Sequence, residues 1–335
     1  MFVSLAGVRF RKTSIAGGAV NLIRCAVFAL VWLGVGMYAQ AGQRILWIDS
    51  YNQGNAWSDG VQRGIMDVLK GNDVELKIHR MDTKRNKAES FKKAAAKKAN
   101  NVIKEYRPDI VIASDDSASK YLVMPYLKDT ALPVVFCGVN HSADKYGYPY
   151  KNATGIIELD PIEKLFYSMS FFTRMEKVGY LAGDTVTSRI NGDSYVRRIR
   201  VDLLERYVNT FSEWQSAFLQ LQEDCDMLVI GNVSAINDWD GKKAYRFVLN
   251  QTRIPTGCVL EIMASYSMIG FIKLPEEKGR WAARTALRVL SGEKISNIPL
   301  GSPVEGRLIL NKLIAESKGI RFPKSFVKNA DRIIE

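Results

Sequence analysis

The chain has 335 residues, of which 47% are hydrophobic and 24% are charged, and its formal net charge is +12. This composition is typical of a globular protein and excludes a disordered or membrane-embedded chain. The basic residues are spread along the sequence, and their densest run, residues 91–98 (FKKAAAKK), fits the outer face of a helix. The charge therefore does not predict a nucleic-acid partner.

Residues 1–41 have the features of an export signal. Basic residues precede an apolar run at 25–38, and Ala39-Gln40-Ala41 is a small-x-small cleavage site. The run is shorter than the about 20 residues that a membrane-spanning helix needs. We predict a signal peptide that is cleaved near Ala41 and a soluble exported protein, with a retained membrane anchor as the alternative.

The first half of the mature sequence alternates strands and helices. Strands are predicted at 44–50, 74–81, 109–113 and 132–139, and helices at 58–70 and 84–106. The continuous apolar runs DIVIA (109–113) and VVFCGV (134–139) are typical of strands that are buried on both faces. This alternation predicts an α/β protein with a parallel sheet.

The same alternation restarts after residue 160. Helices are predicted at 161–172, 188–204, 213–222 and 242–250, and strands at 177–182, 206–211, 226–232 and 257–262. An amphipathic helix at 276–290, an extended segment at 308–311 and a helix through Ala315 follow. The two similar halves predict two doubly wound parallel-sheet lobes that are joined by a hinge near residues 152–160.

We assign the lobes as follows. Residues 42–155 and 268–300 form lobe 1, and residues 156–267 and 301–335 form lobe 2.

The sequence lacks the usual catalytic and metal-binding motifs. It has two histidines, and beyond residue 41 its cysteines are Cys137, Cys225 and Cys258, at long spacings. CxxC, HExxH, GxSxG and P-loop patterns do not occur. We therefore expect no metal site, no cofactor, no disulfide framework and no catalytic residue, and an exported enzyme is the less favoured alternative.

Polar and aromatic side chains follow the predicted strands, where ligands bind in open α/β sheets. In the first half these are Tyr51, Asn52, Trp57, Ser114, Asp115, Asp116, Ser117, Asn140 and His141. At the crossing and in the second half they are Glu158, Asp184, Asn232, Ser234 and Glu261. We predict that these residues bind the ligand.

The acidic residues after the third strand have two interpretations. Asp116 or Ser117 could cap a helix and complement its dipole. The free N–H groups of such a helix would suit an anion. Asp115 and Asp116 would instead accept hydrogen bonds from hydroxyl groups or an amine.

The aromatic and hinge residues are also open to two interpretations. Tyr51 and Trp57 could stack on a ligand ring or pack at the edge of a lobe. Glu158 and Glu261, which flank the predicted crossings, could bind a ligand amine or form hinge hydrogen bonds. His141 is predicted to be a loop histidine and not a general base.

Three segments carry more specific motifs. They are Asn152-Ala153-Thr154-Gly155, the GxxAxxxAxxxLxGE pattern of residues 279–293, and the Asn…Ala…Gly-Ile…Pro pattern of residues 311–323. These segments resemble the periplasmic substrate-binding proteins of ABC importers, with the type I fold, and specifically the uncharacterised ABC substrate-binding group. The resemblance spans residues 43–335 in element order. Where the family often has Asp-Pro after the fourth strand, this chain has Asn140-His141-Ser142.

The resemblance implies a periplasmic receptor whose two lobes close on a small solute, either amino-acid-like or another polar or aromatic molecule. The receptor would deliver this ligand to an ABC permease in the inner membrane. The alternative is a ligand-sensing subunit of the same fold that docks a sensor kinase or a cyclase.

Overall fold

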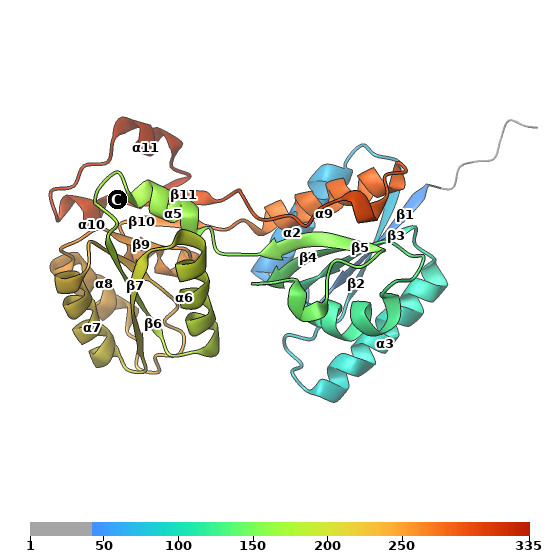
Figure 1. The fold of residues 1–335 in the computed structure, drawn as a ribbon, viewed down its shortest axis with the longest axis horizontal. Helices are drawn as coiled ribbons and strands as arrows, with labels where there is room; N and C mark the ends of the chain where they lie inside the picture. The colour runs from blue at the N-terminus through green and yellow to red at the C-terminus, as the bar shows by residue number, and fades with distance from the viewer. Residues whose placement is uncertain (1–41) are drawn as a thin grey trace, which may run out of the picture. The chain divides into compact units, whose positions relative to one another are not determined.

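The computed structural model describes residues 42–335, so the predicted signal segment, residues 1–41, lies outside the described residues. The described chain forms two sheets (Figure 1). Among residues 42–335, no helix combines the length and the apolar character that crossing a membrane requires.

The first sheet has five parallel strands in the order β2-β1-β3-β4-β5. The strands are β1 (Gln43–Asp49), β2 (Val74–Arg80), β3 (Ile110–Ser114), β4 (Val134–Asn140) and β5 (Ala153–Glu158). Strand β3 is buried along its whole length and β4 along all but its last residue, as the continuous apolar runs predict.

Helices cover both faces of the five-stranded sheet (Figure 1). Helices α2 (Ala56–Leu69) and α9 (Pro275–Leu290) pack on one face. Helix α3 (Glu89–Tyr106) packs on the other face, together with the short α4 (Asp115–Ala118) and a π-helical segment, η1 (Ser119–Leu127). A 3-10 turn, η2 (Asp144–Tyr146), lies between β4 and β5.

The second sheet has seven strands in the order β12-β11-β10-β9-β8-β6-β7. They are β6 (Lys177–Gly183), β7 (Asp202–Val208), β8 (Met227–Ile230), β9 (Thr256–Cys258), β10 (Ile269–Ile272), β11 (Arg307–Asn311) and β12 (Arg332–Ile334). Its pairs are parallel except β10 with β11.

The helices of the second half surround this sheet. They are α5 (Ile162–Met169), α6 (Val186–Ile199), α7 (Phe211–Asp224), α8 (Gly241–Gln251), α10 (Lys312–Glu316) and α11 (Lys324–Asn329). The 3-10 turn η3 (Glu261–Tyr266) follows β9, and η4 (Ile295–Asn297) follows α9. One apolar core joins the helices to the sheet. The predicted fold class, α/β with two parallel-sheet lobes, is confirmed.

The chain passes between the two sheets three times. The first crossing, residues 159–161, joins β5 to α5; the second, 273–274, joins β10 to α9; and the third, 298–306, joins η4 to β11. The lobe boundaries stay a prediction. However, β5 continues to Glu158 in the first sheet, and β10 belongs to the second sheet, so limits near 158 and 273 fit the sheets better than 155 and 268.

Several predicted element ends are wrong. The helix predicted at 84–106 begins at Glu89. The helix predicted at 188–204 ends at Ile199. The strand predicted at 206–211 is β7, which begins earlier, at Asp202, and ends at Val208. The strand predicted at 257–262 ends at Cys258.

Candidate functional site

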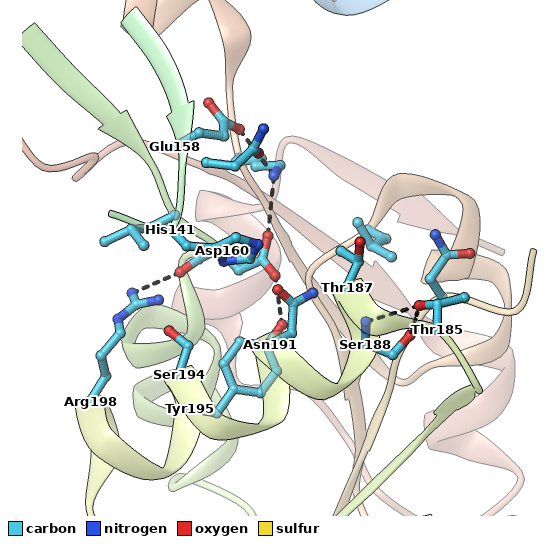
Figure 2. A pocket seen from close by; sticks show the side chains of 15 residues that line it. His141, Glu158, Asp160, Thr185, Thr187, Ser188, Asn191, Ser194, Tyr195 and Arg198 are labelled. Atoms are coloured by element: carbon cyan, nitrogen blue, oxygen red, sulfur yellow. Dashed lines mark hydrogen bonds and ion pairs between the residues drawn. The ribbon is translucent and has the colours of Figure 1, made fainter. Parts of the chain in front are cut away.

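Two cavities lie where the strands of the first sheet end. The first, which we call the aromatic cavity, has a volume of about 290 Å³ and is lined by Tyr51, Trp57 and Asp115, among others. The second, the polar cavity, has a volume of about 120 Å³ and is lined by His141, Asp160, Thr185, Asn191, Ser194, Tyr195, Arg198 and Asn232, among others (Figure 2). Asn140, Glu158 and Lys273 line both cavities.

Tyr51 and Asp115 form one wall of the aromatic cavity. The Tyr51 hydroxyl donates to Asp115 Oδ2 at 2.8 Å, and Lys84 Nζ lies 2.8 Å from Asp115 Oδ1. Burial raises the pKa of Asp115 above its usual value, against the opposing effect of Lys84. Asp115 also has a φ of 75°, in the left-handed region that costs a non-glycine residue energy. Such strained residues cluster at ligand sites, which supports a binding role for Asp115.

A buried hydrogen-bond network next to this wall joins β1, β2, β3 and α2. Asp49 Oδ2 accepts from Ser58 Oγ at 2.5 Å and from Arg80 Nη1 at 2.5 Å. Ser114 Oγ lies 3.2 Å from Asp49 Oδ1, to which it donates, and it accepts from Trp47 Nε1 at 3.0 Å. The hydroxyl of Ser114 is therefore used within the network and lies at neither cavity.

Asp116 fixes the position of Asn140. Asp116 Oδ2 accepts from Asn140 Nδ2 at 2.5 Å, Tyr146 donates to Oδ1 at 2.8 Å, and Lys145 Nζ lies 2.7 Å from Oδ1. Burial alone would raise the pKa of Asp116, but these contacts outweigh it and hold the pKa below its usual value.

The depressed pKa makes Asp116 a source of stability that depends on pH. A carboxylate whose pKa is lowered by folding contributes stability above its unfolded pKa, about 3.9, and loses it as the pH falls further. We expect Asp116→Asn to lower the free energy of unfolding by about 1–2 kcal/mol at pH 7. The difference from the wild type should shrink as the pH falls below about 3.9, through the lowered pKa of Asp116.

Urea denaturation at pH 7, 5 and 3 measures this effect. Asp73→Asn is the matched control, because Asp73 is exposed in the loop before β2 and should change stability little at any of these pH values. An Asp116→Asn deficit that stays constant down to pH 3 would contradict the assignment.

The polar cavity is built around Lys273. Its Nζ lies 3.0 Å from Glu158 Oε1 and 3.2 Å from Asp160 Oδ1. Burial would lower the pKa of Lys273, but the two carboxylates outweigh it and raise the pKa, so the amine stays charged. Tyr195 donates to Asp160 Oδ2 at 2.6 Å, and Figure 2 shows these side chains converging from the first crossing and from α6.

The remaining wall of the polar cavity is neutral or already paired. Thr185 caps α6 by accepting from the Ser188 N–H at 3.0 Å. Arg198 Nη2 donates to the carbonyl oxygen of Asp160 at 2.8 Å and pairs with Glu163. Burial lowers the pKa of His141, so this imidazole is neutral at neutral pH.

Several predicted site residues line neither cavity, and Asp116, which holds Asn140 in place, is one of them. Asn52 donates to the carbonyl oxygen of Gln53, the N–H of Ser117 donates to Asp115, Asp184 pairs with Arg189, and the N–H of Ser234 donates to Asn232. Ligand contact by these residues stays a prediction.

Glu261 lines neither cavity. It begins the 3-10 turn η3 within the seven-stranded half, and its carboxylate binds Arg307 at 2.7 Å and Arg332 at 3.0 Å. Arg307 directly follows the third crossing, so Glu261 lies beside a crossing through this ion pair, and ligand contact by Glu261 stays a prediction.

Sequence reasoning missed Lys273, Asp160 and Tyr195. Lys273 follows β10 directly, so the strand-end rule would have selected it had β10 been predicted. Asp160 directly precedes Pro161 at the first crossing, and this position at the predicted hinge could have identified it as a site residue. Tyr195 lies inside α6, where the sequence gives no signal that distinguishes it from a core residue.

Comparisons with known proteins agree on one class. A family model described as ABC transporter substrate binding protein matches residues 55–334. No curated protein sequence gives a significant match.

Solved structures share the fold. A ligand-free, open substrate-binding protein with adhesive properties from Clostridium difficile is 14% identical, with a TM-score of 0.68, and the match covers 87% of this chain and 99% of that one. An ABC domain in complex with L-Trp from Streptococcus pneumonia is 17% identical, with a TM-score of 0.52 and coverage of 88% and 100%. An ABC transporter solute-binding protein from Bradyrhizobium sp. BTAi1 with bound bis-tris is 12% identical, with a TM-score of 0.55 and coverage of 86% of each chain.

Proposed function

Because the chain belongs to the ABC transporter substrate-binding protein family, we propose that it is a periplasmic receptor that captures a small polar solute at the two cavities and delivers it to an ABC importer. Residues 1–41 would direct export and be removed near Ala41. The family is generally non-enzymatic, and we assign no catalytic residue.

One observation carries the proposal. Asn140, Glu158 and Lys273 line both the aromatic cavity, formed at strand ends of the first sheet, and the polar cavity, whose other wall is α6 from the second half. A solute that touches this shared set would contact both halves of the chain at once. Its binding energy would then favour conformations in which both halves contact the solute. Hinged receptors respond to ligand in this way.

A thermal-shift screen across amino acids, sugars, nucleosides, amines and short peptides tests the receptor function. A ligand that binds the native state alone stabilises it by about 2.7 kcal/mol at one hundred times its Kd, so a true ligand should raise Tm. The same ligand should lose its effect on a variant that combines Asn140→Ala with Lys273→Met. An unchanged Tm shift in that variant would place binding elsewhere on the protein.

Trp57 provides a direct optical signal for binding. Its indole lines the aromatic cavity and lies 5.2 Å from the Tyr51 ring, measured between centroids. We expect a ligand found in the screen to change tryptophan fluorescence, and Trp57→Phe to remove most of that change. Trp239→Phe is the matched control, because Trp239 packs against Trp214 and Tyr266 in the seven-stranded half and lines neither cavity. Loss of the signal in the Trp239 variant instead would contradict the assigned site.

A further inference from the structure

We infer that the solute carries a protonated amine next to an aromatic ring, and that Glu158 accepts hydrogen bonds from this amine. The inference rests on the proposed receptor function and adds the chemical class of the ligand. Buried carboxylates, the local charge balance and the aromatic wall each support it.

Glu158 has unused hydrogen-bonding capacity. Its side chain is buried, with 4% of its surface exposed, and its two charged neighbours are Lys273, 3.0 Å from Oε1, and Lys278, 3.9 Å from Oε2. Lys273 is shared with Asp160, and among the described residues neither carboxylate oxygen of Glu158 accepts a hydrogen bond of good geometry. A buried carboxylate oxygen has more than one acceptor position, so a ligand or water can add a well-oriented donor beside the ionic contacts. Because Glu158 faces both cavities, a ligand can supply the missing donors there.

The charges at the cavities leave one carboxylate uncompensated. Glu158 and Asp160 share Lys273, whereas Asp115 has Lys84 and Asp116 has Lys145. Lys278, which also lies 3.9 Å from Glu158, is closer to its own partner, Glu277, at 3.2 Å. The site is therefore acidic within a chain whose formal net charge is +12. Such a local reversal of charge favours a cation over an anion.

The same balance disfavours a ligand carboxylate. The basic side chains that line the two cavities are Lys273 and Arg198, and both are already paired with acidic residues. An anionic group would have to compete with Glu158 and Asp160 for Lys273. A simple amine meets no such competition, whereas a zwitterionic amino acid does.

The aromatic cavity supplies aromatic side chains against which a ligand ring can pack. Tyr51 and Trp57 lie side by side with their planes tilted by 37°. Lys84 Nζ lies 4.9 Å from the centroid of the Tyr51 ring, so one face of this ring already contacts a cation of the protein, and the ligand amine is left to Glu158. Aromatic faces of this kind stack on a ligand ring, which fits an arylalkyl amine that reaches Glu158 with its nitrogen.

Isothermal titration with four matched probes tests the ligand class. The probes are phenethylamine, the neutral 2-phenylethanol, the anion 3-phenylpropionate, and L-phenylalanine, which adds a carboxylate to the amine. We expect phenethylamine to bind at least tenfold more tightly than each of the other three. Equal or tighter binding of L-phenylalanine, 2-phenylethanol or 3-phenylpropionate overturns the inference, and so does the absence of binding by all four probes.

Glu158→Gln tests the residue itself. It should weaken phenethylamine at least tenfold and leave 2-phenylethanol unchanged. Glu261→Gln is the control, because Glu261 binds Arg307 and Arg332 and lines neither cavity. Unchanged phenethylamine affinity in Glu158→Gln overturns the assignment. The comparison of probes on the wild-type protein needs no variant, so a folding defect in Glu158→Gln leaves that test intact.

The screen and the titration together distinguish an error in the ligand class from an error in the receptor function. If another class of compound raises Tm in the screen while phenethylamine does not bind, the amine inference is wrong and the receptor function stands. If no compound binds by either method, both are wrong.

Discussion

Replacing Gly279 with valine is expected to lower the free energy of unfolding by about 3 kcal/mol or more, the upper range for overpacking. Gly279 lies where α9 crosses α2, and a Cβ atom there would lie 2.1 Å from the carbonyl oxygen of Val61. Because that atom belongs to backbone, no change of side-chain rotamer relieves the clash. On α2, a Cβ at Gly64 would likewise lie 2.0 Å from the carbonyl oxygen of Glu276.

Urea denaturation of Gly279→Val measures the loss. Arg284→Val is the matched control, because it places the same residue on an exposed position of the same helix and should cost about 0.5 kcal/mol through helix propensity. Gly64→Val should cause a loss similar to that of Gly279→Val. The double variant should lose less than the sum, because the two residues share one interface. A Gly279→Val protein as stable as the Arg284→Val control would show that the helices do not approach this closely.

The part of the site that the sequence predicts best is the set of strand ends. Asp115 and Asn140 could be selected because each follows a continuous apolar run, and parallel strands bring such ends to one edge. Glu158 could be selected from its place at the predicted crossing between the lobes. The partners of these residues could not be selected in the same way. Lys84 lies 31 residues from Asp115 in the sequence, and Lys273 lies far from Glu158, so no local spacing indicates either pair.

The errors in the predicted elements also have local causes. Helix α6 ends at Ile199, and the residue after it, Arg200, has a left-handed φ of 58°. Glycine is the usual residue at such a position, so arginine gives no stop signal, and the predicted helix extends into β7. Strands β9 and β10 have three and four residues, which is too few to show the alternating hydrophobic pattern of a strand.

The crossings are held together by a buried ion network that the sequence does not reveal. Lys278 is fully buried on α9, and its Nζ lies 3.2 Å from Glu277 Oε2 and 3.9 Å from Glu158 Oε2. Glu277 Oε1 accepts from the N–H groups of Val304 and Glu305 at 2.6 and 2.9 Å. Through these contacts, Lys278 and Glu277 join the end of β5, the start of α9 and the third crossing.

Lys278→Met is therefore expected to cost about 3–5 kcal/mol of stability, since it removes one partner of a buried pair and leaves Glu277 without a counter-charge. Adding Glu277→Gln should restore part of the loss, because glutamine still accepts from Val304 and Glu305 but carries no charge. Urea denaturation of the two single variants and the double variant gives the coupling energy. Lys97→Met is the control, because Lys97 is exposed on α3 and should stay within about 0.5 kcal/mol of the wild type.

The double variant separates loss of charge pairing from loss of packing. If Lys278 neutralises Glu277, then adding Glu277→Gln to Lys278→Met removes the unpaired charge and the double variant should be more stable than Lys278→Met alone. A packing defect is not repaired by Glu277→Gln. A double variant that is no more stable than Lys278→Met would therefore mean that Lys278 fills space and does not neutralise Glu277.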